Sequence, residues 1–273
     1  MKTKIQDMKL YNSIKRANNE LQLLEDQKKE IDVYSLAHFD QLHYNGLNAI
    51  DNFISEFRIN ENSKILEIGS GIGGPSRYIS YKTGAKVTAL ELQPELNKIA
   101  IKLTNKCKLQ DQVIHLCGDF LEHDFVSEKF DYIVSWLALY HIPNRQYLLS
   151  KSHNLLKKNG VFFAEDFFCY KEFNEKEKTE LKKDFYANYI VTKSKYISDF
   201  KENGFSELRV QDMTEDWKNF VCNRLKNFKN NLDMHLEIND ASVVNDLLFF
   251  YEFVKRYFNK GSLAGIKIYG FKR

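Results

Sequence analysis

The hydrophobic pattern of the chain changes character near residue 63. Before that point, residues 5–30 and 46–57 carry apolar positions three and four apart, which predicts two helices. From Ser63 to Phe168, short apolar runs alternate with helical segments, as in KILEIGS (64–70) followed by GPSRYISYKT. Strands that alternate with helices predict parallel pairing through right-handed crossovers, and hence a doubly wound α/β sheet.

Further apolar runs continue this sheet, and the alternation breaks after Phe168. The expected strands cover 85–92, 113–119, 130–136, 160–168, 207–213 and 264–272, and the later helical stretches cover 174–204 and 215–260. The prediction is therefore a helical lid over 1–57 and a seven-stranded, Rossmann-like α/β domain over 58–273. Its late connections would form a helical cap at about 170–200 and 215–260, with a separate C-terminal domain as the alternative.

Composition narrows the functional classes. The 273 residues are 43% hydrophobic, enough for a sizeable core, and 40 basic against 37 acidic side chains argue against a nucleic-acid partner. The four cysteines show no C-x-x-C spacing, which predicts reduced thiols and no metal site. No run of eighteen apolar residues and no signal-peptide core occur. We therefore expect a cytoplasmic location, no membrane span, and a monomer or homodimer that binds small molecules.

A glycine-rich stretch follows the first expected strand. In ILEIGSGIGG, residues Gly69, Gly71 and Gly73 allow a tight turn and close approach of the backbone to a ligand. Glu91 ends the second expected strand about twenty residues later, where an acid can accept hydrogen bonds from a ribose diol. This arrangement predicts a nucleotide-bearing cofactor, and a tight turn without a ligand is the alternative.

Several motifs resemble those of class I S-adenosylmethionine-dependent methyltransferases. ILEIGSGIGGPSRYIS resembles their first motif and VTALELQPE their second, whereas CGDFLE and FDYIVSWLALYHI resemble the segments that follow, over about residues 60–165. The resemblance implies S-adenosylmethionine as cofactor, with Glu91 on the ribose hydroxyls, Asp119 at the adenine amine and Phe120 against the adenine ring. The implied cofactor residues are Gln41, Glu67, Gly69, Gly71, Gly73, Glu91, Leu92, Asp119, Phe120 and Trp136. Arg77, just past the loop, is expected to be a charge on the helix surface or a brace of the fold.

Methyl transfer from a sulfonium is a direct displacement, so the acceptor atom must be aligned and, for an amine or phenol, deprotonated. His141 follows the fourth expected strand in WLALYHIPN, and an imidazole suits this proton transfer. In phosphoethanolamine-type methyltransferases, a histidine at the matching place takes part in catalysis. The alternative for His141 is a buried residue that caps the following helix.

The resemblance narrows further to small-molecule methyltransferases. GIGGPSRYIS, the helix start with Gly46, and the ending AGIKIYG are similar to the group that includes phosphoethanolamine, sarcosine/dimethylglycine, tocopherol and sterol methyltransferases. Positions that hold phosphate in the phosphobase enzymes fall near Tyr186 and at Phe167, which argues against a phosphate-bearing substrate. The expected acceptor is a small amine, with Tyr140, Phe167, Tyr186 and Tyr189 as its contacts. A C- or O-methyltransferase of a lipid-like or phenolic acceptor, and a non-catalytic cofactor-binding protein, are the alternatives.

The polar stretch DQLHYNG (40–46) belongs to no expected helix or strand. The resemblance places it across the mouth of the cofactor site, as a lid that excludes water. Gln41 and Tyr44 would then donate to cofactor or substrate, and His43 would be a second proton acceptor that faces His141. A polar turn that caps the helix from Leu47 is the alternative.

Overall fold

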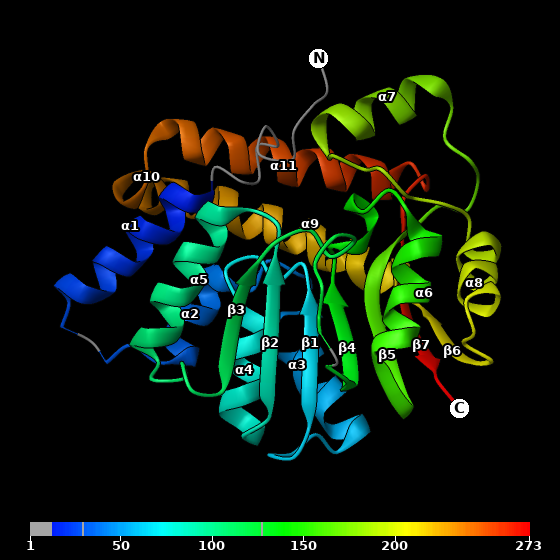
Figure 1. Cartoon of the computed structure of the whole chain (residues 1–273). Helices are drawn as coiled ribbons and strands as arrows, with labels where there is room; N and C mark the ends of the chain where they lie inside the picture. The colour runs from blue at the N-terminus through cyan, green and yellow to red at the C-terminus, as the bar shows by residue number, and fades with distance from the viewer. Residues whose placement is uncertain (1–12, 29, 127) are drawn as a thin grey trace.

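The computed structural model describes residues 13–28, 30–126 and 128–273. They form one seven-stranded sheet with helices around it (Figure 1). Its strands are β1 (Lys64–Ile68), β2 (Lys86–Glu91), β3 (Val113–Cys117), β4 (Phe130–Trp136), β5 (Leu156–Phe168), β6 (Glu207–Asp212) and β7 (Ala264–Phe271). Their order across the sheet is β3-β2-β1-β4-β5-β7-β6, with β1 to β5 parallel and β7 antiparallel to both neighbours. The predicted α/β fold is confirmed.

Helices cover both faces of the sheet, which explains why its central strands β1, β2 and β4 are largely buried. On one face, α3 (Gly46–Phe57) and α4 (Gly74–Thr83) bury residues such as Phe53 and Ile79 against β1, β2 and β4. On the other face lie α6 (Arg145–Leu155) and α8 (Lys193–Glu202), with Leu148 and Phe200 in the core. α5 (Pro94–Lys106) packs beside β2 and β3.

A helical cap lies across the carboxyl ends of the parallel strands, above the arrowheads in Figure 1. It contains α7 (Glu175–Asp184), α9 (Thr214–Asn230), α10 (Leu232–Ile238) and α11 (Ala241–Asn259). Trp217, Phe250 and other aromatic side chains form its core together with Phe167 from the end of β5. The predicted cap at 170–200 includes α8, but α8 packs on α6 and the sheet through Tyr196 and Phe200.

The N-terminal part contains one helix more than the sequence predicted. The helix expected over 5–30 spans Ser13–Asp26 as α1, and positions 5–12 and 29 lie outside the described residues. α2 (Val33–Asp40) was not expected. It begins with a capping box, in which the Asp32 carboxylate accepts from the backbone of Ser35 while the Ser35 hydroxyl accepts from Asp32 N. Asp40, the first residue of DQLHYNG, is therefore the last residue of a helix.

The sheet topology fixes where a ligand binds. From β1 the chain proceeds outward to β2 and β3, and it then returns to place β4 on the other side of β1. The crossovers leave a crevice at the carboxyl ends of β1 and β4, the switch point at which open α/β sheets bind ligands. Within the described parts of the chain, we find no helix that combines the length and apolar character needed to cross a membrane.

Candidate active site

A glycine loop joins β1 to α4 at the switch point. Gly69, Gly71 and Gly73 all have positive φ, at 74°, 55° and 79°, a region that favours glycine. A Cβ on Gly69 would lie 2.4 Å from the Cβ of Ala138, so the loops after β1 and β4 are in direct contact. At Gly69 and Gly71 the wall of the cavity is therefore backbone without a side chain, which lets a cofactor approach closely.

Glu91 ends β2 with its carboxylate fixed beside this loop. Oε2 accepts a hydrogen bond from Gly71 N at 2.8 Å, and Oε1 accepts one from Gln93 N at 2.9 Å. Burial raises the pKa of Glu91 to about 7. Each carboxylate oxygen has a second lone pair, so the side chain can also accept from a vicinal diol in the cavity.

Glu67 lies below the loop, on β1. It accepts a hydrogen bond from the hydroxyl of Ser76 on α4, and burial raises its pKa to about 8. At neutral pH this side chain is therefore a neutral acid that can donate as well as accept. The neighbouring Ser70 lines the cavity, and its buried hydroxyl oxygen has no hydrogen-bond partner among the described residues.

Residues at the ends of β2, β3 and β4 complete this half of the cavity. Asp119 is fixed by a hydrogen bond from Leu121 N to Oδ1, at 2.8 Å. Phe120 is buried, Leu92 lies exposed at the rim, and Trp136 closes the inner wall. This half of the cavity therefore offers carboxylate and hydroxyl groups that can bond a ribose, and apolar side chains that can lie against an adenine ring. These groups fit the ribose and adenine of S-adenosylmethionine.

A short 3-10 turn, η3 (Leu139–His141), forms the opposite wall after β4. Asp166 on β5 accepts from Tyr140 N at 3.2 Å through Oδ1 and pairs with Arg145 at 3.1 Å through Oδ2. The Arg145 Nη2 also donates to the carbonyl oxygen of Leu139 at 3.1 Å. Because Arg145 and Asp166 are fully buried, this ion pair fixes the turn from below.

The hydrogen bond of His141 determines its tautomer. Nδ1 lies 3.0 Å from the carbonyl oxygen of Tyr186, which can only accept, so Nδ1 carries the hydrogen. Burial lowers the pKa of His141 to about 4, and the ring is therefore neutral at pH 7 with its lone pair on Nε2. A neutral imidazole at the edge of the cavity is positioned to accept a hydrogen bond or a proton, and the burial that keeps it neutral also makes it a weaker base than an ordinary histidine.

Aromatic side chains surround the cavity near His141. Tyr140 stacks on Phe185 with ring centroids 4.8 Å apart, and it meets the edge of Phe167 at 5.1 Å. Phe250 from α11 and Tyr44 from segment 40–46 also line the cavity. Such walls attract a cationic ammonium group and also accept apolar rings or chains.

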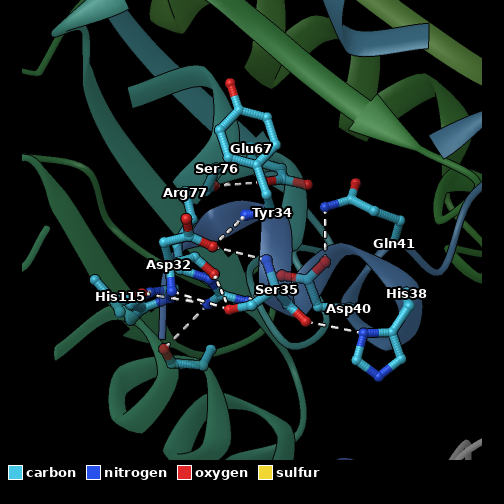
Figure 2. A network of polar contacts seen from close by, with 12 residues as sticks. Asp32, Tyr34, Ser35, His38, Asp40, Gln41, Glu67, Ser76, Arg77 and His115 are labelled. Carbon is cyan, nitrogen blue, oxygen red and sulfur yellow. Dashed lines mark hydrogen bonds and ion pairs between the residues drawn. The ribbon is translucent and has the colours of Figure 1, made fainter. Parts of the chain in front are cut away.

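A buried ion pair holds the start of segment 40–46, which the sequence predicts to be a lid and which we call the lid loop. Asp40 at the end of α2 meets the Arg77 Nη2 of α4 at 2.9 Å, and both side chains are almost fully buried. Arg77 Nη1 donates to Ala100 O and to the Thr104 hydroxyl, each at 3.3 Å. Figure 2 shows the residues around this pair, with His115 close by. Arg77 is thus a brace of the fold, and the alternative of a charge on the helix surface is wrong.

The lid residues themselves differ in their placement. Gln41 donates to Asp40 Oδ1 at 2.8 Å (Figure 2) and does not line the cavity. His43 lines the cavity, has Nε2 3.1 Å from the carbonyl oxygen of Gly46, and has a pKa lowered to about 4 by burial. Tyr44 is buried at the cavity wall, and burial raises its pKa to about 12, so its hydroxyl is protonated at neutral pH.

Most sequence-predicted site residues meet at this one cavity, and their roles remain predictions. Those that line it are His43, Tyr44, Glu67, Gly69, Gly71, Glu91, Leu92, Asp119, Phe120, Trp136, Tyr140, His141 and Phe167. Gly73 lies beneath the loop against His115, and Tyr189 donates its hydroxyl to Asp199 at 2.6 Å, away from the cavity. Tyr186 contributes its carbonyl oxygen to His141 and is not among the lining side chains.

Sequence reasoning missed several lining residues, including Asp40, Ser70, Leu137 and Phe250. Ser70 lies inside the glycine motif and Asp40 inside DQLHYNG, so position in a motif was an available signal for both. Phe250 comes from the middle of an aromatic-rich helix. Nothing in its local sequence separates it from ordinary core packing.

Comparisons with known proteins agree with this geometry. A family model described as a methyltransferase domain matches residues 66–164. The chain is 27% identical to a phosphoethanolamine N-methyltransferase of Plasmodium falciparum over 180 residues, which are 64% of this chain and 66% of that protein. It is 35% identical to a sterol 24-C-methyltransferase of Debaryomyces hansenii over 107 residues, 39% of this chain and 28% of the relative.

A solved structure shows the same fold. The Haemonchus contortus phosphoethanolamine N-methyltransferase 2, in complex with phosphomonomethylethanolamine and S-adenosylhomocysteine, superposes with a TM-score of 0.78 at 19% identity. The match covers 85% of this chain and 54% of that protein. The chain thus spans two thirds or less of each of these three relatives.

Proposed function

Because the chain carries a class I S-adenosylmethionine-dependent methyltransferase domain, as its sequence predicted, we propose that it methylates the nitrogen of a small amine. One observation carries this proposal. The same cavity is lined by the strand-end residues that suit the cofactor and, opposite them, by the neutral His141. The acceptor would resemble sarcosine, dimethylglycine or phosphoethanolamine.

The cofactor, when bound, supplies a methyl group on a positively charged sulfur. Glu91 and Asp119 would hold its ribose and adenine, and the glycine loop would let the chain approach it closely. His141 would accept the proton that the amine loses, through Nε2, while the Tyr186 carbonyl keeps Nδ1–H in place. Tyr140, Phe167 and Phe185 would stabilise the positive charge of the methylated nitrogen.

A C-methyltransferase with a lipid-like acceptor is the second candidate. Phe167, Phe185 and Phe250 make the acceptor end of the cavity strongly apolar, which suits a hydrocarbon as well as an ammonium ion. The relative from Debaryomyces hansenii is named for methylation at a carbon atom. A neutral histidine is compatible with both reactions.

An acceptor screen with radiolabelled S-adenosylmethionine tests the proposal. The panel contains small amines with and without carboxylate or phosphate groups, phenols, and sterol-like lipids. We expect methylation of an amine. Tight cofactor binding without methylation of any member would refute the enzyme activity, and methylation of only the lipids would select the second candidate.

His141→Ala is then measured on the best acceptor. We expect kcat to fall roughly a hundredfold or more, because the proton acceptor is removed. His123→Ala is the matched control, since His123 lies in a loop outside the cavity. Turnover of His141→Ala at near wild-type rate would restrict His141 to a structural role.

A further inference from the structure

A second cavity lies behind the lid loop, on the side away from the glycine loop. Leu42, His43 and Phe250 line both cavities, so these side chains are part of the wall between the two spaces. The second cavity has a volume of about 650 Å³, is open to solvent, and is lined by the lid loop together with α1, α2, α9, α10 and α11. That volume suits a small molecule.

The lining of this second cavity carries positive charge and no negative charge among the described residues. Arg16 and Arg224 contribute guanidinium groups, and no aspartate or glutamate belongs to the lining. Asn223, Asn227 and Asn231 follow one another at four-residue spacing along α9 and its C-cap, so one helix face brings exposed amide side chains to the cavity, and the Asn231 amide also donates to the Asn227 carbonyl oxygen. Amide and guanidinium donors without a carboxylate favour an anionic ligand.

Arg224 is the centre of this arrangement. Its guanidinium carbon lies 4.4 Å from the ring centroid of Tyr251, 5.0 Å from that of Tyr44 and 5.4 Å from that of Phe220. Its buried Nε and Nη2 atoms make no hydrogen bond of good geometry among the described residues, and the Tyr44 hydroxyl is a polar group within reach of its charge. Aromatic faces attract a guanidinium, but they do not satisfy its N–H groups.

Arg224 differs from the other arginines that have a buried, unbonded nitrogen atom, because each of the others lies near a carboxylate. Arg77 pairs with Asp40 and Arg145 pairs with Asp166, whereas Arg16 has Glu20 at 3.6 Å. For Arg224, no described carboxylate lies within ion-pair distance. A cation with buried N–H groups and no counter-charge is costly, and an anionic ligand removes that cost.

We propose that the second cavity binds a small molecule with a phosphate or carboxylate group, and that Arg224 holds the anion with help from the asparagine amides. Because Leu42 and His43 face both cavities, an occupant presses on the back of the lid and changes how the lid closes over the first cavity. The anion belongs either to the methyl acceptor or to a separate molecule, and the experiment distinguishes these sources.

Titration calorimetry with inorganic phosphate, and in a second series with acetate, tests the site directly on the full chain. We expect saturable binding that Arg224→Met weakens at least about tenfold, because charge-assisted hydrogen bonds are lost while the ring contacts are kept. Arg224→Lys should fall between the two. Lys226→Met is the matched control, since it removes the same charge from an exposed position of α9 outside the cavity.

Binding that is equal in wild type and Arg224→Met, or no saturation below about 20 mM of either anion, overturns the proposal. Circular dichroism and thermal melting confirm that the variants are folded. Because no methyl transfer is measured, the result stands even if the proposed activity fails.

With an active acceptor in hand, inhibition by phosphate identifies the source of the anion. Competition with the acceptor, together with a raised KM in Arg224→Met, shows that the anion is part of the acceptor. Phosphate that changes cofactor affinity without such competition identifies a separate ligand. Either pattern supports the site, whereas inhibition that is unchanged in Arg224→Met counts against it.

Discussion

Two buried arginine–aspartate pairs hold the two halves of the active-site cavity, and they do so in different ways. Arg77 and Asp40 join α4 to α2, so they attach the lid to the helix that follows the glycine loop. Arg145 and Asp166 join α6 to β5, and they brace the turn that carries His141. The first pair connects the cofactor half to a segment outside the sheet, and the second keeps the acceptor half on the sheet.

The Arg145–Asp166 pair makes more hydrogen bonds with its surroundings than the Arg77–Asp40 pair does. Asp166 accepts from Tyr140 N, from Arg145 and from the Tyr196 hydroxyl, and burial still raises its pKa above the ordinary value. Asp40, the last residue of α2, accepts from Arg77 on α4 and from its neighbour Gln41. We therefore infer that the acceptor turn is the more rigid of the two. The lid is held by the Asp40–Arg77 pair at its base, by the burial of Tyr44 and by the surface hydrogen bond from Asn45 to Asp216.

The strongest test of this difference is Arg145→Met. It leaves the Asp166 carboxylate buried without its cation, which should cost about 3–5 kcal/mol of unfolding free energy. Urea denaturation measures the change. The double variant Arg145→Met/Asp166→Leu should recover at least half of the loss, and a single-variant cost below about 1 kcal/mol would contradict the rigid-turn interpretation.

Gly69→Ala tests the contact between the halves. The new Cβ meets Ala138 at 2.4 Å and requires a positive φ, so we expect a loss of about 2–3 kcal/mol and cofactor affinity lowered at least tenfold. Gly261→Ala is the matched control, because Gly261 has φ of 67° and nothing within 4 Å of the position that its new Cβ would take. Equal effects of the two changes would show that the loops are not pressed together.

Glu67→Gln tests the electrostatics of the cofactor half. The folded pKa of Glu67, about 8, lies above the ordinary 4.5, so the folded state retains a proton that the unfolded chain has released. Stability from this group is therefore lost as pH rises toward 8, by about 1.4 kcal/mol between pH 6 and pH 7. Glutamine removes this contribution, and denaturation curves at both pH values should differ less in the variant. An unchanged pH dependence would mean that Glu67 is ionised in the folded state.

Asn45→Gly should have the smallest effect. Asn45 has φ of 60°, which glycine also adopts, and its amide donates to Asp216 at 2.6 Å on the exposed surface. Losing this tie between lid and α9 should cost about 0.5 kcal/mol and alter cofactor affinity less than about threefold. A larger change in affinity, measured by calorimetry, would show that the surface tie holds the lid as firmly as the buried ion pair does.

The cofactor half could be predicted from the sequence because its residues follow strand ends. Parallel strands bring their carboxyl ends to one edge, so Gly69, Glu91 and Asp119 become neighbours as soon as the strand order is known. Each is also marked by a local motif. The pattern of short apolar runs and of alternation placed all seven strands, and it is clearest for β1, β2 and β4, which are buried on both faces.

The acceptor half could not be predicted to the same degree. Its lining comes from α2, η3, α11 and the end of β5, and tertiary packing alone decides which aromatic side chains face the cavity. Tyr186 illustrates the difficulty. It follows the end of α7 with φ of 48°, and it is the carbonyl oxygen that reaches His141. A backbone reversal of this kind leaves no trace in hydrophobic periodicity.

The position of β7 has a consequence for synthesis on the ribosome. β7 lies between β5 and β6, yet it follows α9, α10 and α11 in the chain. While those helices are translated, one edge of β5 has no neighbouring strand, and β6 has nothing to pair with until residues 264–271 emerge. The parallel strands that carry the cofactor residues are complete much earlier. The nascent chain therefore acquires its nucleotide-binding edge first, and its substrate chamber is finished only by the last strand.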